Sequence, residues 1–170
     1  MKSKNISGFT LIEILVVVVI ISILSVMGVQ MISSGSVERN LKQHGRVLQA
    51  SIEYSCDQAT LQNIPYGIHI FTKGYAFSQF IDQQWVDLIS EEILVSKEII
   101  DGSLFSLEIE GHSVVLKDEI DEIPQIMCDS TGQLIAFEIH ISDATNTHKY
   151  QLKTIDFWNL QGQWLNVSKN

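Results

Sequence analysis

One carboxylate, Glu13, lies inside a long apolar run, where its chemistry is unusual. From Phe9 to Val29, 16 of 21 residues are apolar, and Glu13 is the only charged one. Burying a carboxylate costs free energy unless a cation pairs with it. On an insertion scale, an ionisable residue at the centre of a membrane-spanning helix costs about 2.5–3.5 kcal/mol, and less near the helix end. Glu13 is therefore a functional candidate that needs a partner cation.

Four carboxylates within five residues form a second candidate, because Ca²⁺ binds to clustered oxygen ligands. Adjacent carboxylates in a polar loop are more often simply solvated. We favour the solvated loop, so the sequence predicts neither a metal site nor a cofactor. The four residues are Asp118, Glu119, Asp121 and Glu122.

Cys56 and Cys128 are the only cysteines of the sequence. Cys56 falls on the apolar face of an expected helix, and Cys128 closes an expected core strand. A bond between them in an oxidising compartment would close a loop of 72 residues, which contributes about 4 kcal/mol in the chain-entropy model. The alternative is two buried free thiols that act as small apolar side chains. We favour the disulfide, and both interpretations stay open here.

Three basic residues, Arg39, Lys42 and Arg46, follow one another at steps of three and four. This spacing places them on one side of a helix. A solvated helix face is the simpler interpretation. The alternative is a contact stripe that binds anionic lipid headgroups or acidic residues of a neighbouring helix.

No catalytic signature is present in the sequence. It contains no Gly-rich phosphate loop, no His-Glu-x-x-His and no Gly-x-Ser-x-Gly motif. No two of its five histidines stand at metal-ligand spacing, and His140 is expected on the solvent side of its strand. We therefore expect that the protein is not an enzyme and binds no small-molecule substrate.

The composition is that of one globular domain with an acidic surface. The chain has 170 residues, 45% of them apolar, with 11 basic and 20 acidic side chains and a net charge of −9. These proportions exclude disorder and disulfide-dense miniproteins. The acid excess argues against nucleic-acid binding, because affinity for phosphates comes largely from Lys and Arg.

The apolar run has about the ~20 residues that an α-helix needs to cross a bilayer. Lys2 and Lys4 precede it without any acidic residue, which places the N-terminus in the cytoplasm. A cleaved signal peptide would have a shorter apolar stretch and a small-x-small cleavage site. A plain signal anchor fits the length but gives no reason for Glu13.

The following segments predict an α+β fold. A second apolar stripe at helical spacing predicts an amphipathic helix to about Gln62, which Asn63-Ile64-Pro65 ends. Roughly eight alternating strands are expected after it, so that the helix packs on an antiparallel sheet or small sandwich. The stripe consists of Val37, Leu41, Gly45, Leu48, Ile52, Cys56 and Ala59. The strands are expected near Tyr66–Phe71, Tyr75–Phe80, Leu104–Ile109, Val114–Leu116, Pro124–Cys128, Leu134–Ile141, Lys149–Phe157 and Trp164–Val167.

The run Ser7-Gly8-Phe9-Thr10-Leu11-Ile12-Glu13 resembles the signal of type IV prepilins and type II secretion pseudopilins. The resemblance implies that a prepilin peptidase cleaves the chain after Gly8 and that Phe9 is then N-methylated. It also implies that Glu13 pairs with the N-terminal amine of a neighbouring subunit. The expected parts are a leader at 1–8, a transmembrane or filament-core helix at 9–29, its amphipathic continuation at 30–62 and a β-rich periplasmic part at 63–170.

The globular part resembles the H-type minor pseudopilins, through Asn63…Tyr66-Gly67, Gly74-Tyr75-Ala76-Phe77 and Pro124-Gln125-Ile126 through Gly132-Gln133. Cys128 departs from the family, which commonly has an aromatic residue there. The resemblance implies a structural subunit of the type II secretion pseudopilus, anchored in the inner membrane and partnered by major and minor pseudopilins. The alternatives are a minor pilin of a type IV pilus and a membrane-anchored periplasmic binding module.

Overall fold

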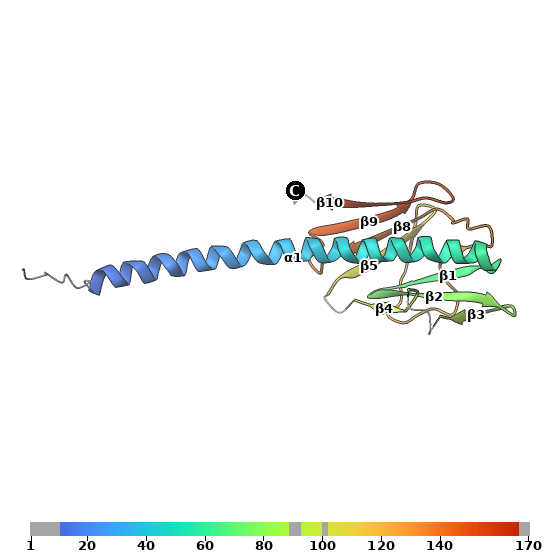
Figure 1. Ribbon diagram of the computed structural model, residues 1–170, viewed down its shortest axis with the longest axis horizontal. Helices are drawn as coiled ribbons and strands as arrows, with labels where there is room; N and C mark the ends of the chain where they lie inside the picture. The colour runs from blue at the N-terminus through green and yellow to red at the C-terminus, as the bar shows by residue number, and fades with distance from the viewer. Residues whose placement is uncertain (1–10, 89–92, 100–101, 167–170) are drawn as a thin grey trace, which may run out of the picture. The chain divides into compact units, whose positions relative to one another are not determined.

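The structure, a computed structural model, describes the backbone of residues 11–88, 93–99 and 102–166, with the side chains of 24–35 and 166 excepted (Figure 1). The predicted leader, together with Gly8 and Phe9, lies outside the described residues. Two compact units divide the chain, Met1–Val37 and Glu38–Asn170. The boundary between them lies one residue after Ser33-Ser34-Gly35-Ser36, a run of low helix propensity.

Helix α1 comprises Leu11–Gln62. It ends as the sequence predicts, because Asn63 adopts a left-handed φ of 54° and the Ile64 N–H donates to the Ala59 carbonyl at 3.1 Å. This is the bonding pattern of a Schellman motif, and Pro65 follows it. Among the described residues, no helix is both long and apolar enough to cross a membrane.

Two antiparallel sheets make up the rest of the second unit. Sheet A has the order β3-β2-β1-β7, with β4 paired to β2, and sheet B has the order β10-β9-β8-β5-β6. The strands are β1 (Tyr66–Phe71), β2 (Gly74–Ile81), β3 (Gln84–Asp87), β4 (Lys97–Glu98), β5 (Leu104–Ile109), β6 (His112–Val114), β7 (Ile126–Cys128), β8 (Phe137–Ser142), β9 (His148–Thr154) and β10 (Leu160–Asn166).

The part of α1 within the second unit packs on both sheets. Its predicted apolar stripe is buried from Leu41 to Ala59, whereas Val37, the first residue of that stripe, belongs to the first unit. Gly45 lies against the ring of Tyr150 on β9, and Cys56 is bonded to Cys128 on β7. The core therefore lies where this helix meets the inner faces of the two sheets, and the α+β fold predicted from the sequence is confirmed.

Several strand predictions were wrong in detail. β3 and β4 were not expected, and β6 ends at Val114, so Leu116 lies outside it. β8 begins at Phe137 rather than Leu134, and Ile135, which precedes the strand, is 38% exposed. The reason is that the Leu134 N–H donates to the Phe157 carbonyl at 2.8 Å, which holds this segment as a connection outside β8.

Candidate functional site

The beginning of α1 is apolar on all sides. Every residue from 11 to 23 is exposed within this unit, and its large apolar side chains are 46–84% exposed. A helix that is apolar all round is ordinarily buried, in a protein core or in a membrane. This segment has no cover from the described residues of its own chain.

Glu13 lies in the first turn of α1, and its side chain is exposed. A carboxylate in this position is favoured by the partial positive charge of the helix N-terminus. The nearest basic residues in sequence, Lys2 and Lys4, lie outside the described residues. An incoming cation would therefore find Glu13 accessible on an otherwise apolar surface.

The three residues of the predicted basic stripe, Arg39, Lys42 and Arg46, differ in their contacts. Lys42 Nζ forms an ion pair with Glu38 Oε1 at 2.5 Å and lies 5.2 Å from the ring centroid of Trp164 on β10. Arg39 and Arg46 are exposed. Lys42 therefore helps to hold β10 to α1, whereas Arg39 and Arg46, about two turns apart, are the two that face outward.

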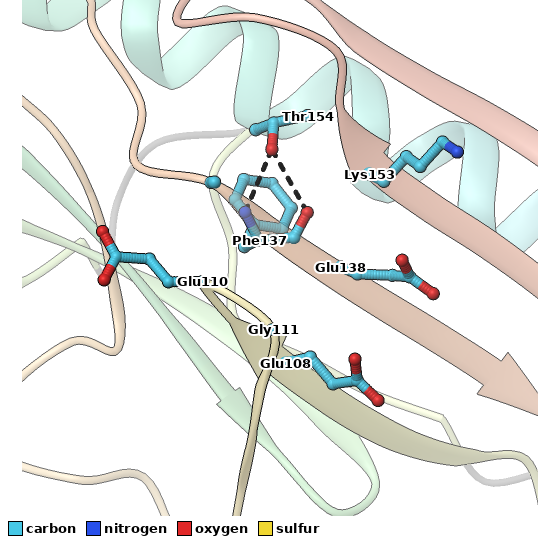
Figure 2. Close-up of a pocket in the computed structure, with 8 residues that line it drawn as sticks. Glu108, Glu110, Gly111, Phe137, Glu138, Lys153 and Thr154 are labelled. Carbon is cyan, nitrogen blue, oxygen red and sulfur yellow. Dashed lines mark hydrogen bonds between the residues drawn. The ribbon is translucent and has the colours of Figure 1, made fainter.

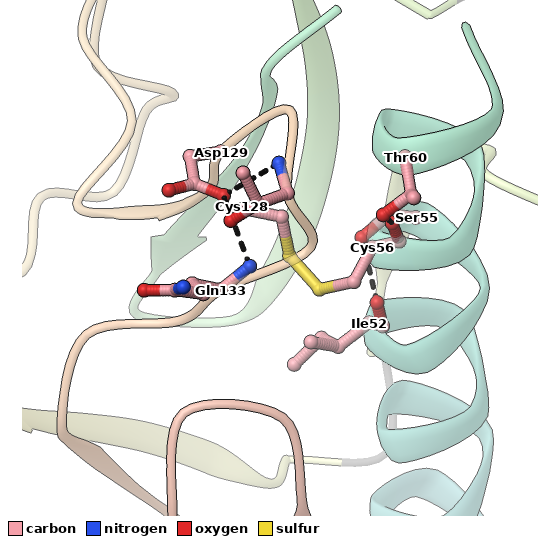
Figure 3. The surroundings of a disulfide bond; sticks show 8 residues. Ile52, Ser55, Cys56, Thr60, Cys128, Asp129 and Gln133 are labelled. Carbon is pink, nitrogen blue, oxygen red and sulfur yellow. Dashed lines mark hydrogen bonds between the residues drawn. A yellow bond between two sulfur atoms is a disulfide. The ribbon is translucent and has the colours of Figure 1, made fainter. Parts of the chain in front are cut away.

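The structure joins Cys56 and Cys128 in a disulfide bond that links α1 to β7 (Figure 3). Their Cα atoms are 5.2 Å apart, within the range usual for disulfides. Both residues are buried. The bond fixes the C-terminal half of the helix to sheet A.

The turn after Cys128 is held by Asp129. Its Oδ1 accepts hydrogen bonds from the Thr131 hydroxyl at 2.7 Å and from the N–H groups of Thr131 and Gln133 at 2.8 and 3.0 Å. The Thr131 hydroxyl, foremost among these donors, lowers the pKa of Asp129. Gly132 has a φ of +79°, and a Cβ there would meet Thr60 on the helix. Asp at the first position and Gly at the fourth are typical of such a turn.

The acidic cluster has partners within its own chain. Thr72 donates its hydroxyl proton to Asp118 Oδ1 at 2.5 Å, and Lys117 forms an ion pair with Asp121. Gln125 donates to Asp121 Oδ2 at 3.1 Å. Within the described residues, no group of three or more His, Cys, Asp or Glu side chains is arranged to hold a metal ion. Asp118 and Asp121 thus hold the loop between β6 and β7 to the β1–β2 turn and to neighbouring residues of the loop.

His140 is less exposed than its predicted position on the solvent side implies. Its side chain is 14% exposed, and Nε2 lies 2.8 Å from Glu138 Oε1. Glu138 also accepts a hydrogen bond from Gln151, which in turn accepts one from Gln163. Burial within this polar ladder lowers the pKa of His140.

A hollow of about 180 Å³ lies beside β5, β8 and β9 (Figure 2). In the sheet register, Glu138 lies opposite both Glu108 and Lys153. The Phe137 N–H donates to Thr154 Oγ1 at 3.0 Å, and the Thr154 hydroxyl donates to the Phe137 carbonyl at 3.3 Å. These hydrogen bonds hold β8 to β9, and we assign no reaction to this charged sheet surface.

Sequence reasoning missed the turn between β9 and β10, which presents Ile155, Phe157 and Trp158 to solvent at 61%, 60% and 58% exposure. The alternating pattern predicts a strand that continues to Phe157, whereas β9 ends at Thr154. The signal that could have found the turn is Asp156 three residues before Asn159, since Asp side chains commonly accept hydrogen bonds from the following backbone N–H groups.

Residues 3–29 match the family described as the prokaryotic N-terminal methylation motif. The chain is 24% identical over 166 residues to the type II secretion system protein H of Aeromonas hydrophila, covering 91% of this chain and 90% of that protein. It is 28% identical over 147 residues to the protein H of Pseudomonas aeruginosa, covering 80% and 83% of the two chains.

Two solved structures show the same fold. The minor pseudopilin EpsH of Vibrio cholerae aligns with a TM-score of 0.64 at 15% identity, over 79% of this chain and 99% of that one. The solution structure of E. coli GspH aligns with a TM-score of 0.60 at 18% identity, over 75% and 91%.

With its long α1 and two antiparallel sheets the chain has a pilin-like fold, and residues 3–29 match the N-terminal methylation motif. In sequence and in fold the chain resembles the H-type minor pseudopilins of type II secretion, which confirms the resemblance predicted from the sequence.

Proposed function

We propose that this protein is a structural, non-enzymatic subunit of the type II secretion pseudopilus, an H-type minor pseudopilin in the export of folded proteins across the outer membrane. The observation that carries this proposal is the exposed apolar beginning of α1 with Glu13 in its first turn. Such a helix needs cover from lipid or from other helices. The inner membrane supplies that cover before assembly, and neighbouring subunits supply it in the filament.

Processing precedes assembly. A prepilin peptidase cleaves between Gly8 and Phe9, and Phe9 is then N-methylated. The match of residues 3–29 to the methylation motif supports this processing. Cleavage before the apolar segment leaves 9–29 on the mature chain, so the protein stays in the inner membrane with 30–170 in the periplasm. The Cys56–Cys128 disulfide is compatible with that oxidising compartment.

Glu13 is the assembly carboxylate in this proposal. Its partner is the α-ammonium group of a neighbouring major or minor pseudopilin, whose charge compensates the carboxylate among apolar side chains. Arg39 and Arg46, which face outward, provide further contacts to acidic residues of neighbouring subunits or to lipid headgroups. The acid excess of the chain argues against nucleic acid as a partner.

The first test is the intact mass and N-terminal sequence of the protein from membranes, with and without prepilin peptidase. A chain that starts at methylated Phe9, seen only with the peptidase, is the expected result. A chain that keeps Met1, or one cleaved beyond Val29, would contradict the proposal and leave an anchored or secreted binding module.

A second test assigns the filament. Deleting the protein should abolish export of folded enzymes into the medium while type IV pili remain on the cell. Loss of pili with normal export would show a minor pilin instead. Glu13→Gln should be cleaved and inserted normally but should not restore export; full restoration by this variant would contradict the role of the carboxylate.

A further inference from the structure

The turn between β9 and β10 exposes two large aromatic side chains side by side. Phe157 is 60% exposed and Trp158 is 58% exposed, and their ring centroids lie 6.0 Å apart in an edge-to-face arrangement. Ile155, in the same turn, is 61% exposed. Neighbouring exposed apolar side chains of this size commonly mark an interaction site.

Asp156 holds this turn in one conformation. Its Oδ1 accepts hydrogen bonds from the N–H groups of Trp158 and Asn159, both at 2.9 Å, and the Asn159 side-chain amide donates to both carboxylate oxygens at 3.0 Å. The Ile155 N–H donates to the Asn159 carbonyl at 2.9 Å. The aromatic pair is therefore positioned before any partner arrives, which reduces the entropy lost on binding.

Trp158 forms one wall of a groove of about 230 Å³. The last part of α1 also lines this groove, where Glu53 and Asp57 are exposed and stand one helical turn apart. Glu53 accepts a hydrogen bond from Gln49 at 2.9 Å, and it keeps further acceptor positions. The remaining lining residues are Cys56, Thr60, Thr131, Gly132, Leu134 and Asn159.

A groove lined by an indole ring and two carboxylates is suited to a cationic side chain. Arg and Lys bind the face of Trp through cation–π attraction and bind carboxylates through charged hydrogen bonds. A second hollow, of about 370 Å³, shares Leu134 with this groove and is lined by Leu134, Ala136, Thr154, Ile155, Asp156 and Phe157. That hollow can take apolar side chains next to the cation.

We propose that the groove between Trp158 and the Glu53–Asp57 turn of α1 docks a segment of a different pilin-like subunit that presents Arg or Lys flanked by apolar side chains. This inference rests on the proposed filament function. A second copy of this chain is a poor occupant, because 20 acidic against 11 basic residues make two copies repel each other. The acidic groove instead complements a basic segment.

The test uses the full chain in cells that assemble the secretion filament. A photo-crosslinking amino acid, p-benzoylphenylalanine, replaces Trp158, and control chains carry it at Val115 or at Val16. Val115 is 91% exposed in the connection after β6, and Val16 is 49% exposed in the apolar part of α1. We expect the Trp158 position to give an adduct with another pilin-like subunit, attached to a peptide that contains Arg or Lys, and the Val115 position not to give it.

Charge reversal tests the carboxylates. In the chain that carries the photo-crosslinking amino acid in place of Trp158, Glu53→Lys with Asp57→Lys should reduce the amount of adduct at least tenfold. The matched control, Glu119→Lys with Glu122→Lys, reverses the same number of exposed charges away from the groove and should leave the adduct unchanged. Circular dichroism and non-reducing electrophoresis of each purified chain show that the fold and the disulfide persist; Glu53→Gln with Asp57→Asn serves if the reversed chain unfolds.

Three outcomes would overturn the inference. One is adducts at Val16 but none at Trp158, which leaves the filament function intact. Another is a Trp158 adduct with a second copy of this chain or with a segment lacking Arg and Lys. The third is an adduct unaffected by charge reversal. Absence of adducts at both Val16 and Trp158 would instead contradict the proposed filament function and the groove together.

Discussion

The ring of Tyr150 on β9 lies directly against Gly45 of α1, in space that a side chain at position 45 would fill. Gly45 lies within the apolar stripe, at a position where a residue of higher helix propensity would otherwise be expected. Its low helix propensity is outweighed by the close approach of an aromatic ring to the helix backbone. This contact anchors sheet B to the helix.

Gly45→Ala should therefore destabilise the protein. Alanine gains about 1 kcal/mol in helix propensity, but its Cβ overlaps the Tyr150 ring, and overpacking of this kind costs typically 1–3 kcal/mol. We expect a net fall in the free energy of unfolding, measured by urea denaturation. In a Tyr150→Ala background the same substitution should be neutral or stabilising. An equal effect in both backgrounds would contradict the contact.

Removing the disulfide should lower the free energy of unfolding by more than Gly45→Ala does. Cys56→Ala with Cys128→Ala opens a loop of 72 residues, and the chain-entropy model gives about 4 kcal/mol for such a loop. The expected result is a lower urea midpoint for the variant, matched by the wild-type chain under reducing conditions. If reduction leaves the wild-type midpoint unchanged, the bond contributes nothing to stability.

Asp143 should make the stability depend on pH. Burial alone raises its pKa, but hydrogen bonds from the His148 N–H and from the Thr145 and Thr147 side chains hold it well below the usual range. Because the folded pKa is the lower one, the contribution is present above the unfolded value of about 4 and is lost as pH falls below it.

Asp143→Asn should accordingly lower the free energy of unfolding at pH 7 and weaken its decline between about pH 4 and pH 2. Urea titrations at several pH values measure both effects. Asp82→Asn, at an exposed hairpin position, is the control. A variant whose pH profile is parallel to that of the wild type would exclude Asp143 as the cause.

The outward-facing cations should affect assembly but not folding. Arg39→Glu with Arg46→Glu is expected to reduce recovery of the protein in sheared filaments severalfold, while the midpoint of urea unfolding stays within error. Lys42→Glu should behave differently, because it also breaks the ion pair with Glu38 and the contact with Trp164. Normal filament recovery of the double variant would remove the stripe from the assembly surface.

Local patterns predicted the helix and the turns that depend on nearby residues. The stripe from Leu41 to Ala59 follows the helical period, and the turn at Asp129 has the residue types its hydrogen bonds need. The β2–β3 hairpin was missed because its turn residues, Asp82 and Gln83, both have positive φ, which Gln rarely adopts.

Contacts between residues far apart in the chain could not be predicted from the sequence. Lys42 contacts Trp164, which is far away in the chain. The sequence therefore could not show that Lys42 differs from Arg39 and Arg46. The end of β9 is determined by the hydrogen bonds of Asp156 and not by the alternation of apolar and polar residues. The alternation predicts a longer strand, so the exposure of Phe157 and Trp158 could not be predicted. The groove beside Trp158 exists only because that turn meets α1.

The link between Cys56 and Cys128 also determines how the domain responds to mechanical load. A pull on the two ends of the chain follows the covalent path through the disulfide, so residues 57–127, which contain β1 to β6, bear no tension. Only the helix before Cys56 and the segment after Cys128 can be drawn out. A subunit pushed or pulled by its helix therefore keeps most of sheet A shielded from the force.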